Sequence, residues 1–203
     1  MVKTLSELAK PEVCAVIVVD LQNDFCHNDG VMAKQGRSCD MAQKAAHNTA
    51  AFLEEARKRK VRVIFIRNNH NQWNVSQAYL NRKDDDSPKP CEEGTWGEEF
   101  FVVSPLKTEA VVVKHRYSAF IGTDLDVILR SKRIQTLIMT GVATGTCVES
   151  TARDGFMMDY NIVVLSDCTG ARSPEVHNAA LNALALSFGI VTTSKELLEA
   201  WSE

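Results

Sequence analysis

Short apolar runs rich in valine and isoleucine recur along the chain and predict its strands. Most of them lack the strict in-out alternation of a half-solvated sheet, so they indicate strands that are covered on both faces. The runs span residues 13–19, 61–66, 110–113, 134–140, 161–165 and 189–193.

Helical signals lie between several of these runs. Residues 40–58 carry Ala, Phe and Leu at helical spacing and end in the basic run RKRK, which suits a helix C-terminus. Thr123 with Asp126 resembles a capping box, and the Ser-Pro pair at 173–174 predicts the start of a helix that extends to about residue 188. Ser194 opens a last predicted helix.

Strands that alternate with helices imply right-handed βαβ crossovers. We therefore expect an α/β fold with a doubly wound, six-stranded, mostly parallel sheet and helices on both faces. A chain of 203 residues with 45% hydrophobic residues fits one domain, residues 1–203. Residues 81–97 form a polar insertion, either a solvated loop or a lid whose Trp96 contacts ligand.

Charge and composition limit the partners that the chain can take. The net charge is -3, and no basic block or interleaved basic and aromatic pattern indicates binding of nucleic acid or of an anionic membrane. The apolar stretch at 13–19 is too short to span a bilayer and lacks the flanks of a signal peptide, so we expect a cytoplasmic protein. A small molecule or a protein is the expected partner.

Six cysteines are scattered along the chain, at positions 14, 26, 39, 91, 147 and 168. None belongs to a CxxC pair, and their spacings are not those of a disulfide scaffold, so we expect no zinc-finger site. In a reducing compartment, most of them are expected to be small buried hydrophobic side chains. Cys26 is interpreted in this way, and Asp24 as a turn residue.

Chemically active side chains follow three of the predicted strands. Ligands of open α/β sheets bind outside the carboxyl ends of the strands, near the point where the strand order reverses. Asp20 follows the first run, Lys114 the third, and Cys147 the loop after the fourth. Taken singly, Asp20 could be a turn or cap residue, and Lys114 a solvated strand end.

Other polar residues are expected at the same edge of the sheet. Arg67, Asn68 and His70 follow the second run, and Asp167 follows the fifth. For His70 the plainer interpretation is a loop or pocket residue.

The sequence around Cys147 favours a nucleophile. Small residues in GVATGT allow a sharp turn, and CVESTARDGF continues with a helical pattern. A thiol in the first turn of a helix is expected to have a lowered pKa, and the free amides there could hold an oxyanion. With Lys114 to stabilise the anions and Asp20 to accept and return the proton, Cys147 could attack a carbonyl without a histidine base.

Three segments in this order resemble the signature regions of the isochorismatase-like cysteine hydrolases. They are VIVVDLQNDFC, VVVKHRYSAF and GVATGTCVESTARD, and the likeness runs from about residue 13 to 195. The resemblance implies the isochorismatase-like hydrolase fold and an Asp-Lys-Cys triad at Asp20, Lys114 and Cys147. It also implies a cis peptide between Val142 and Ala143, an oxyanion hole from the backbone amides of Ala143 and Cys147, and a homo-oligomer, either a dimer or a tetramer.

Departures from the family pattern narrow the expected chemistry. Nicotinamidases carry a metal-binding Asp-x-His and a further His, whereas Asn68 and Asn74 stand near those positions here, so we expect neither a metal nor another cofactor. Isochorismatases that cleave a vinyl ether lack the cysteine, so Cys147 favours hydrolysis of a C–N bond through a thioester. Gly145 replaces an Asn found in many relatives, which affects the expected shape of the oxyanion loop.

The stretches GTWGEEF, KHRYSAFIGTDLDVILRS and CVESTARDGF resemble most the ureidoacrylate amidohydrolase and biuret hydrolase branch. That branch implies a small linear amide as substrate, a carbamoyl or ureido compound. The candidate residues for substrate binding are Asn68, Trp73, Trp96 and Tyr117, and each aromatic could equally serve packing.

Two other functions remain open from the sequence. One is a noncatalytic α/β module that binds a small molecule, and the other is a nicotinamidase-like amidase of different specificity. A redox or phosphate-handling enzyme is disfavoured, because no GxGxxG follows the first strand and GVATGTC lacks the Walker lysine.

Overall fold

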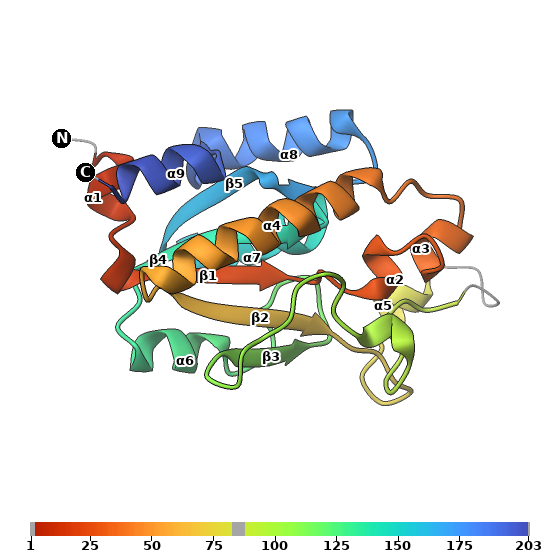
Figure 1. The fold of residues 1–203 in the computed structure, drawn as a ribbon. Helices are drawn as coiled ribbons and strands as arrows, with labels where there is room; N and C mark the ends of the chain where they lie inside the picture. Colours follow the sequence, from red (N-terminus) through yellow and green to blue (C-terminus); the bar gives the residue numbers. More distant parts are fainter. Residues whose placement is uncertain (1–2, 83–87, 203) are drawn as a thin grey trace.

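The computed structural model describes residues 3–82 and 88–202, and its centre is a six-stranded sheet in the order β3-β2-β1-β4-β5-β6 (Figure 1). Every pair of neighbouring strands is parallel. The strands are β1 (Cys14–Val19), β2 (Arg62–Asn68), β3 (Ala110–Lys114), β4 (Thr136–Val142), β5 (Asn161–Gly170) and β6 (Gly189–Thr192). The predicted α/β fold class is confirmed, and the sheet is parallel throughout.

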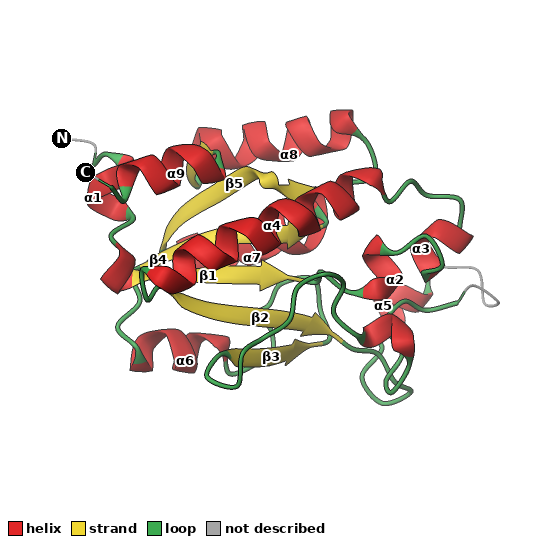
Figure 2. Cartoon of the chain, viewed as in Figure 1, coloured by secondary structure: helices red, strands yellow, loops and turns green. Residues whose placement is uncertain are grey.

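Helices cover both faces of this sheet (Figure 2). The longest is α4 (Asp40–Lys58), and the others are α1 (Leu5–Leu8), α2 (Asn23–Cys26), α3 (Val31–Lys34), α5 (Gln77–Leu80), α6 (Leu125–Ser131), α7 (Glu149–Met157), α8 (Pro174–Ser187) and α9 (Ser194–Ala200). No helix within the described residues is long and apolar enough to cross a membrane.

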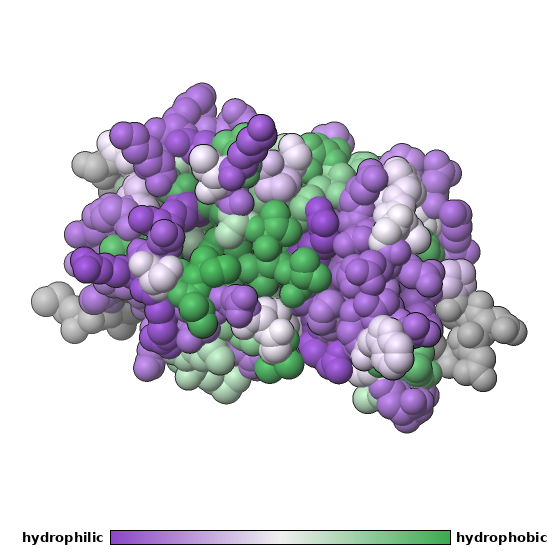
Figure 3. Space-filling view, turned by 90° about the horizontal axis from the view of Figure 1, so that it is seen from below, coloured by the Kyte–Doolittle hydropathy of each residue, from purple (hydrophilic) through white to green (hydrophobic). Residues whose placement is uncertain are grey.

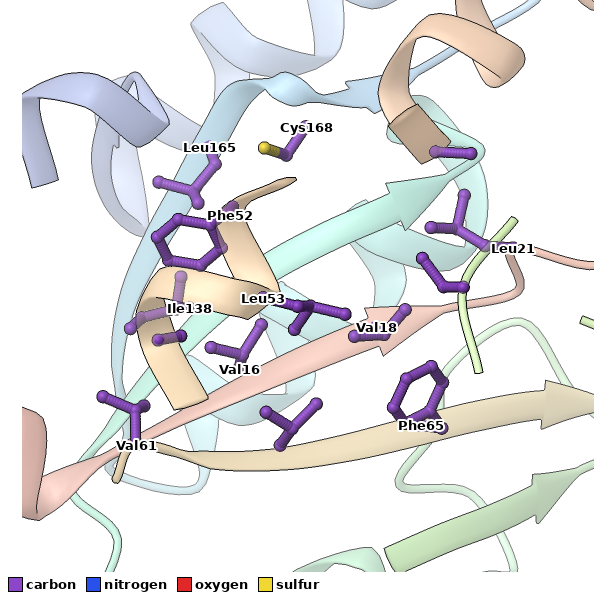
Figure 4. Close-up of a cluster of buried hydrophobic side chains, with 14 of the residues drawn as sticks. Val16, Val18, Leu21, Phe52, Leu53, Val61, Phe65, Ile138, Leu165 and Cys168 are labelled. Atoms are coloured by element: carbon purple, nitrogen blue, oxygen red, sulfur yellow. The ribbon is translucent and has the colours of Figure 1, made fainter. Parts of the chain in front are cut away.

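The sheet separates two hydrophobic clusters. On one face, α4 packs Phe52 and Leu53 against Val16, Phe65 and Ile138 of the strands (Figure 4). On the other face, α6, α7 and α8 cover the side chains that alternate with these along the same strands. Burial on both faces is the reason that the sequences of the central strands β1 and β4 are continuous, mainly apolar runs.

Several predicted helix boundaries agree with the structure, and one predicted cap does not. Ser173 accepts a hydrogen bond from the backbone of α8 just before a proline in the first turn, and α4 and α9 begin where predicted. Thr123 bonds the amide of Leu125, but Asp126 pairs with Arg130 and accepts the Tyr160 hydroxyl. The capping box predicted at this place is therefore wrong, because the Asp side chain has stronger partners elsewhere.

The strand ends differ from the prediction in two places that matter for the site. Strand β2 continues to Asn68, so Arg67 and Asn68 lie within the strand. Strand β5 continues to Gly170, and its register against β4 shifts between Met139 and Gly141. Asp167 lies in this irregular part and accepts hydrogen bonds from the amide and hydroxyl of Ser194, which begins α9. The expectation that Asp167 joins the site is therefore wrong.

The polar insertion at 81–97 is anchored where it is described, and its residues 83–87 lie outside the described part. Asp24, which is buried, accepts the amide of Cys91 at 2.7 Å and that of Val31 at 3.0 Å. Gly97 packs so closely against this carboxylate that a Cβ would lie 2.0 Å from its Oδ2. Asp24 is thus more than a turn residue, since it ties the insertion to the segment after β1. A lid function of the insertion stays a prediction.

Strand β3 forms one edge of the sheet and exposes apolar side chains. Val111 is 39% and Val113 42% exposed, whereas Val112 between them is buried. Figure 3 shows the molecule from below, and an apolar patch lies near the middle of this view.

Candidate active site

Asp20, Lys114 and Cys147 come together in the interior of the protein. The chain passes from β1 outward to β2 and β3 and then returns to β4 on the other side of β1, so the strand order reverses between β1 and β4 (Figure 1). Lys114 Nζ lies 2.7 Å from Asp20 Oδ2 and 3.5 Å from Cys147 Sγ. Asp20 and Lys114 are at most 1% exposed, and Cys147 is 9% exposed.

The backbone fixes Asp20 and Lys114 firmly. Asp20 follows β1 with a φ of 50°, and its amide donates to Ile66 of β2. Lys114 is the last residue of β3, and its ammonium also donates to the carbonyl of Arg116 at 3.0 Å. Besides Lys114, no backbone amide or other nitrogen donor among the described residues is aligned with the Asp20 oxygens. The carboxylate is therefore held by one ion pair and can still accept a proton.

The loop after β4 presents Cys147 in a wide helical turn, Thr144–Val148, that leads into α7. The amides of Thr146 and Val148 both donate to the carbonyl of Ala143, and the Thr151 hydroxyl donates to the carbonyl of Cys147. The peptide between Val142 and Ala143 is cis, as the family resemblance implies.

The electrostatics of the three side chains correct one prediction. Burial raises the pKa of the Cys147 thiol to about 12; Lys114 acts in the opposite direction, and Asp20 adds to the rise. The predicted lowering of this pKa at the start of a helix is therefore wrong for the resting site, because the thiol is buried and the Asp20 carboxylate disfavours a second negative charge beside it. Burial opposes a charge on Lys114, but Asp20 and Cys147 raise its pKa to about 12. Burial also raises the pKa of Asp20, against the effect of Lys114.

Of the four predicted substrate-binding residues, only Asn68 is buried beside the triad. It is paired with Lys114 across β2 and β3, and its side-chain nitrogen lies 3.2 Å from His70 Nε2. Trp73 is 87%, Tyr117 50% and Trp96 46% exposed, and the Trp96 ring contacts His27 edge-on. A role of these aromatic residues in substrate binding stays a prediction.

Two further groups support the site and were not predicted from the sequence. The Gln22 side chain accepts the amide of Asn68 and donates to its carbonyl, so it joins the segment after β1 to the end of β2. The Thr144 hydroxyl lies 2.8 Å from Nδ1 of His177 on α8, and both side chains are buried. Gln22 lies in the segment VIVVDLQNDFC, so a polar side chain directly after a buried strand was a signal that the sequence offered. No local pattern in the sequence indicates that Thr144 contacts His177.

The absence of a side chain at Gly145 does not leave extra space for a substrate. A Cβ at this position would face α8, at 3.5 Å from Ala180 and from Val176, which is ordinary van der Waals contact. Its φ of -86° is accessible to any residue.

The fold is thus a doubly wound parallel sheet with a buried acid, lysine and thiol at the place where the strand order reverses. The isochorismatase domain profile matches residues 14–196, so the chain belongs to the isochorismatase family.

Similar proteins extend over almost the whole chain. A ureidoacrylate amidohydrolase of Caulobacter vibrioides is 33% identical over 92% of this chain and 90% of its own length. A cysteine hydrolase structure from Pseudomonas syringae pv. phaseolicola has a TM-score of 0.85 and 28% identity, covering 96% of this chain and 95% of the other. An N-carbamoylsarcosine amidase structure from Thermoplasma acidophilum has a TM-score of 0.75 and 26% identity, covering 89% and 96%.

Proposed function

We propose that the protein is a cysteine-dependent amidohydrolase that cleaves a C–N bond of a small linear carbamoyl or ureido compound through a thioester. Family membership and relatives named amidohydrolase or amidase support an amidohydrolase of a small amide. The observation that carries the catalytic assignment is the position of Lys114 Nζ between Asp20 and Cys147.

In the first half of the reaction, Cys147 Sγ adds to the substrate carbonyl carbon as Asp20 takes the thiol proton. Because the resting thiol has a raised pKa, this proton moves during the attack and not before it. Lys114 keeps its positive charge beside both groups and stabilises the thiolate as it forms. The backbone amides of Ala143 and Cys147 are the proposed donors to the oxyanion.

In the second half, Asp20 returns the proton to the departing nitrogen, and the C–N bond breaks. Ammonia or an amine leaves, and the acyl group stays on Cys147 as a thioester. Asp20 then takes a proton from water while the hydroxyl adds to the thioester carbonyl. The C–S bond breaks, the acid or carbamate is released, and Asp20 returns the proton to the sulfur, which restores the thiol. One water is consumed in each cycle.

The assignment is tested by replacing the nucleophile. Cys147→Ala should abolish ammonia release from a substrate found in a screen of ureidoacrylate, biuret, carbamoyl amino acids, nicotinamide and aliphatic amides. Cys168→Ala, a buried cysteine of β5, is the matched control and should keep the activity. Near-normal turnover by Cys147→Ala on a genuine substrate would refute the mechanism, and a wild-type protein inactive on every amide would favour a binding module.

Two further properties belong to the proposal. All six cysteines are free, which supports a reducing compartment such as the cytoplasm. The family resemblance supports a homo-oligomer, a dimer or a tetramer, and sedimentation velocity measures this directly.

A further inference from the structure

Strand β3 leaves one edge of the sheet accessible. Within the described residues, β2 is its only neighbour in the sheet, and β3 is the lowest strand in Figure 1. Figure 3, which is seen from below, shows an apolar patch on this side of the molecule. At the opposite edge of the sheet, Ile190 and Val191 of β6 are partly buried. The outer edge of β3 is therefore the more exposed of the two.

The sequence of β3 has none of the features that keep an edge strand from pairing with another chain. Such strands usually carry an outward lysine, a proline or a bulge. β3 reads AVVVK, and its register against β2 is regular. Its charged residue, Lys114, is buried and paired with Asp20. The side chains of Val111 and Val113, which are 39% and 42% exposed, are the ones left in solvent.

The backbone groups at the outer edge belong to the same two valines. The carbonyl of Lys114 accepts the amide of Asn69, which directly follows β2, so the backbone of Lys114 is turned toward β2. Because this direction alternates along a strand, the backbone of Val112 is also turned toward β2, and those of Val111 and Val113 are turned away. Among the described residues, no backbone group outside the sheet bonds to either valine. Each therefore offers an N–H donor and a C=O acceptor at the edge.

This edge is complementary to itself. When two copies of β3 run antiparallel with Val112 opposite Val112, Val111 of each copy lies opposite Val113 of the other. These are then the hydrogen-bonded pairs, which exchange both N–H···O=C bonds, and their exposed side chains meet on one face of the sheet. A two-fold axis at Val112 generates this contact. An unrelated peptide could use the same backbone groups, but β3 itself matches the symmetric placement of the valines.

We propose that the outer edge of β3 binds the same edge of a second copy of this chain, so that two sheets join into one. This inference rests on the homo-oligomer of the proposed function and adds to it the surface that forms the contact. Because Lys114 is the last residue of β3, the contact also holds the strand that carries the ammonium of the site. The strands of the two copies are antiparallel, so the two active sites lie at opposite sides of the joined sheet.

The test places charges at the two exposed positions and measures the oligomer by sedimentation velocity. In Val111→Lys/Val113→Lys, lysine faces lysine across the contact, so the dissociation constant should rise by about 100-fold or more. In Val111→Glu/Val113→Lys, glutamate faces lysine, so most of the association should be retained. Both variants replace the same two valines by charged residues, so the difference between them reports the antiparallel pairing and not the loss of the valines.

Leu186→Lys is the control for an added surface charge. Leu186 is 86% exposed on α8, which packs beside β6 at the other edge of the sheet. This variant should keep the dissociation constant of the wild type, and circular dichroism checks that all variants fold. Amide hydrogen exchange gives a measurement that needs no variant, because the amides of Val111 and Val113 should be protected in the oligomer of the wild type.

The outcomes separate this inference from the proposed function. An oligomer that Val111→Lys/Val113→Lys leaves intact, or that both double variants disrupt equally, overturns the inference while the homo-oligomer stands. Fast exchange at both valine amides in the wild-type oligomer also overturns it. A wild type that is monomeric at every concentration removes the homo-oligomer as well, and the amidohydrolase assignment is tested separately by Cys147→Ala.

Discussion

At the scale of single residues, the Asp20–Lys114 ion pair gives the clearest energetic prediction. The pair is almost completely buried, with its charged atoms 2.7 Å apart. Lys114→Met leaves the carboxylate of Asp20 in the interior without a counter-ion and should lower the free energy of unfolding by roughly 3–5 kcal/mol. Urea denaturation followed by tryptophan fluorescence measures this loss.

The double variant Asp20→Asn/Lys114→Met is the control for this prediction. It removes both charges, so it should recover most of the lost stability although it stays inactive. If it is as unstable as Lys114→Met alone, the loss comes from packing of the lysine side chain and not from the unpaired charge.

The three triad positions could be predicted because each lies at or just beyond the end of a strand. Asp20 directly follows β1, Lys114 is the last residue of β3, and Cys147 follows β4 and a short loop. The rule that parallel strands bring their carboxyl ends to one edge predicted Asp20, Lys114 and Cys147 near one another, and the family resemblance implied that they form a triad. The same rule failed for Asp167, because an irregular register in β5 turns this residue toward Ser194. The protonation of Cys147 was also missed, since burial depends on tertiary packing that the local sequence does not show.

At the scale of elements, helix α8 supports the loop that carries the proposed oxyanion donors. Thr144 lies between Ala143 and Cys147, and its hydroxyl is bound to His177 of α8. Thr144→Val keeps the shape of the side chain and removes this bond, so the loop is less well fixed. We expect kcat to fall about tenfold, which corresponds to about 1.4 kcal/mol, with a much smaller effect on KM.

A matched variant separates this effect from a general loss of stability. Thr49 of α4 is another fully buried threonine, and its hydroxyl donates to the carbonyl of Cys168 on β5. Thr49→Val should lower stability by a similar amount and leave kcat unchanged. Equal values of kcat for the two variants would show that the contact between Thr144 and His177 does not position the oxyanion loop.

The strands themselves could be predicted from composition, but their exact ends and order could not. Runs of Val and Ile mark all six strands, including the edge strand β3, in which Val111 and Val113 are exposed. The polar residues at the end of β2 and the small residues at the end of β4 do not belong to these runs, so the sequence did not show that the strands extend over them. The extension of β4 depends on Gly141, where a Cβ would lie 1.9 Å from the carbonyl oxygen of Val19 in β1. Such a contact between strands is not encoded locally.

At the scale of the whole molecule, buried thiols make stability sensitive to alkaline pH. Burial raises the pKa of Cys14, Cys147 and Cys168 from an ordinary value of 9.0 to about 12. Between these two values the folded protein binds more protons than the unfolded chain, so the free energy of unfolding falls as the pH rises. The contribution of each thiol is complete below pH 9 and is lost as the pH approaches 12.

Cys168→Ala measures how much one thiol contributes to the fall in the free energy of unfolding at alkaline pH. The variant is expected to be less stable than the wild type at pH 8, and the gap should narrow by about 1.4 kcal/mol at pH 10, because only the wild type loses the contribution of this group. Urea denaturation at both pH values under reducing conditions measures the change. Val163→Ala is the control, because it removes apolar volume from the same strand but no titrating group. The difference in free energy of unfolding between this variant and the wild type should therefore stay constant with pH. If both gaps are constant, Cys168 titrates alike in the folded and unfolded states, and the alkaline sensitivity has to come from Cys147, Lys114 and the other buried groups.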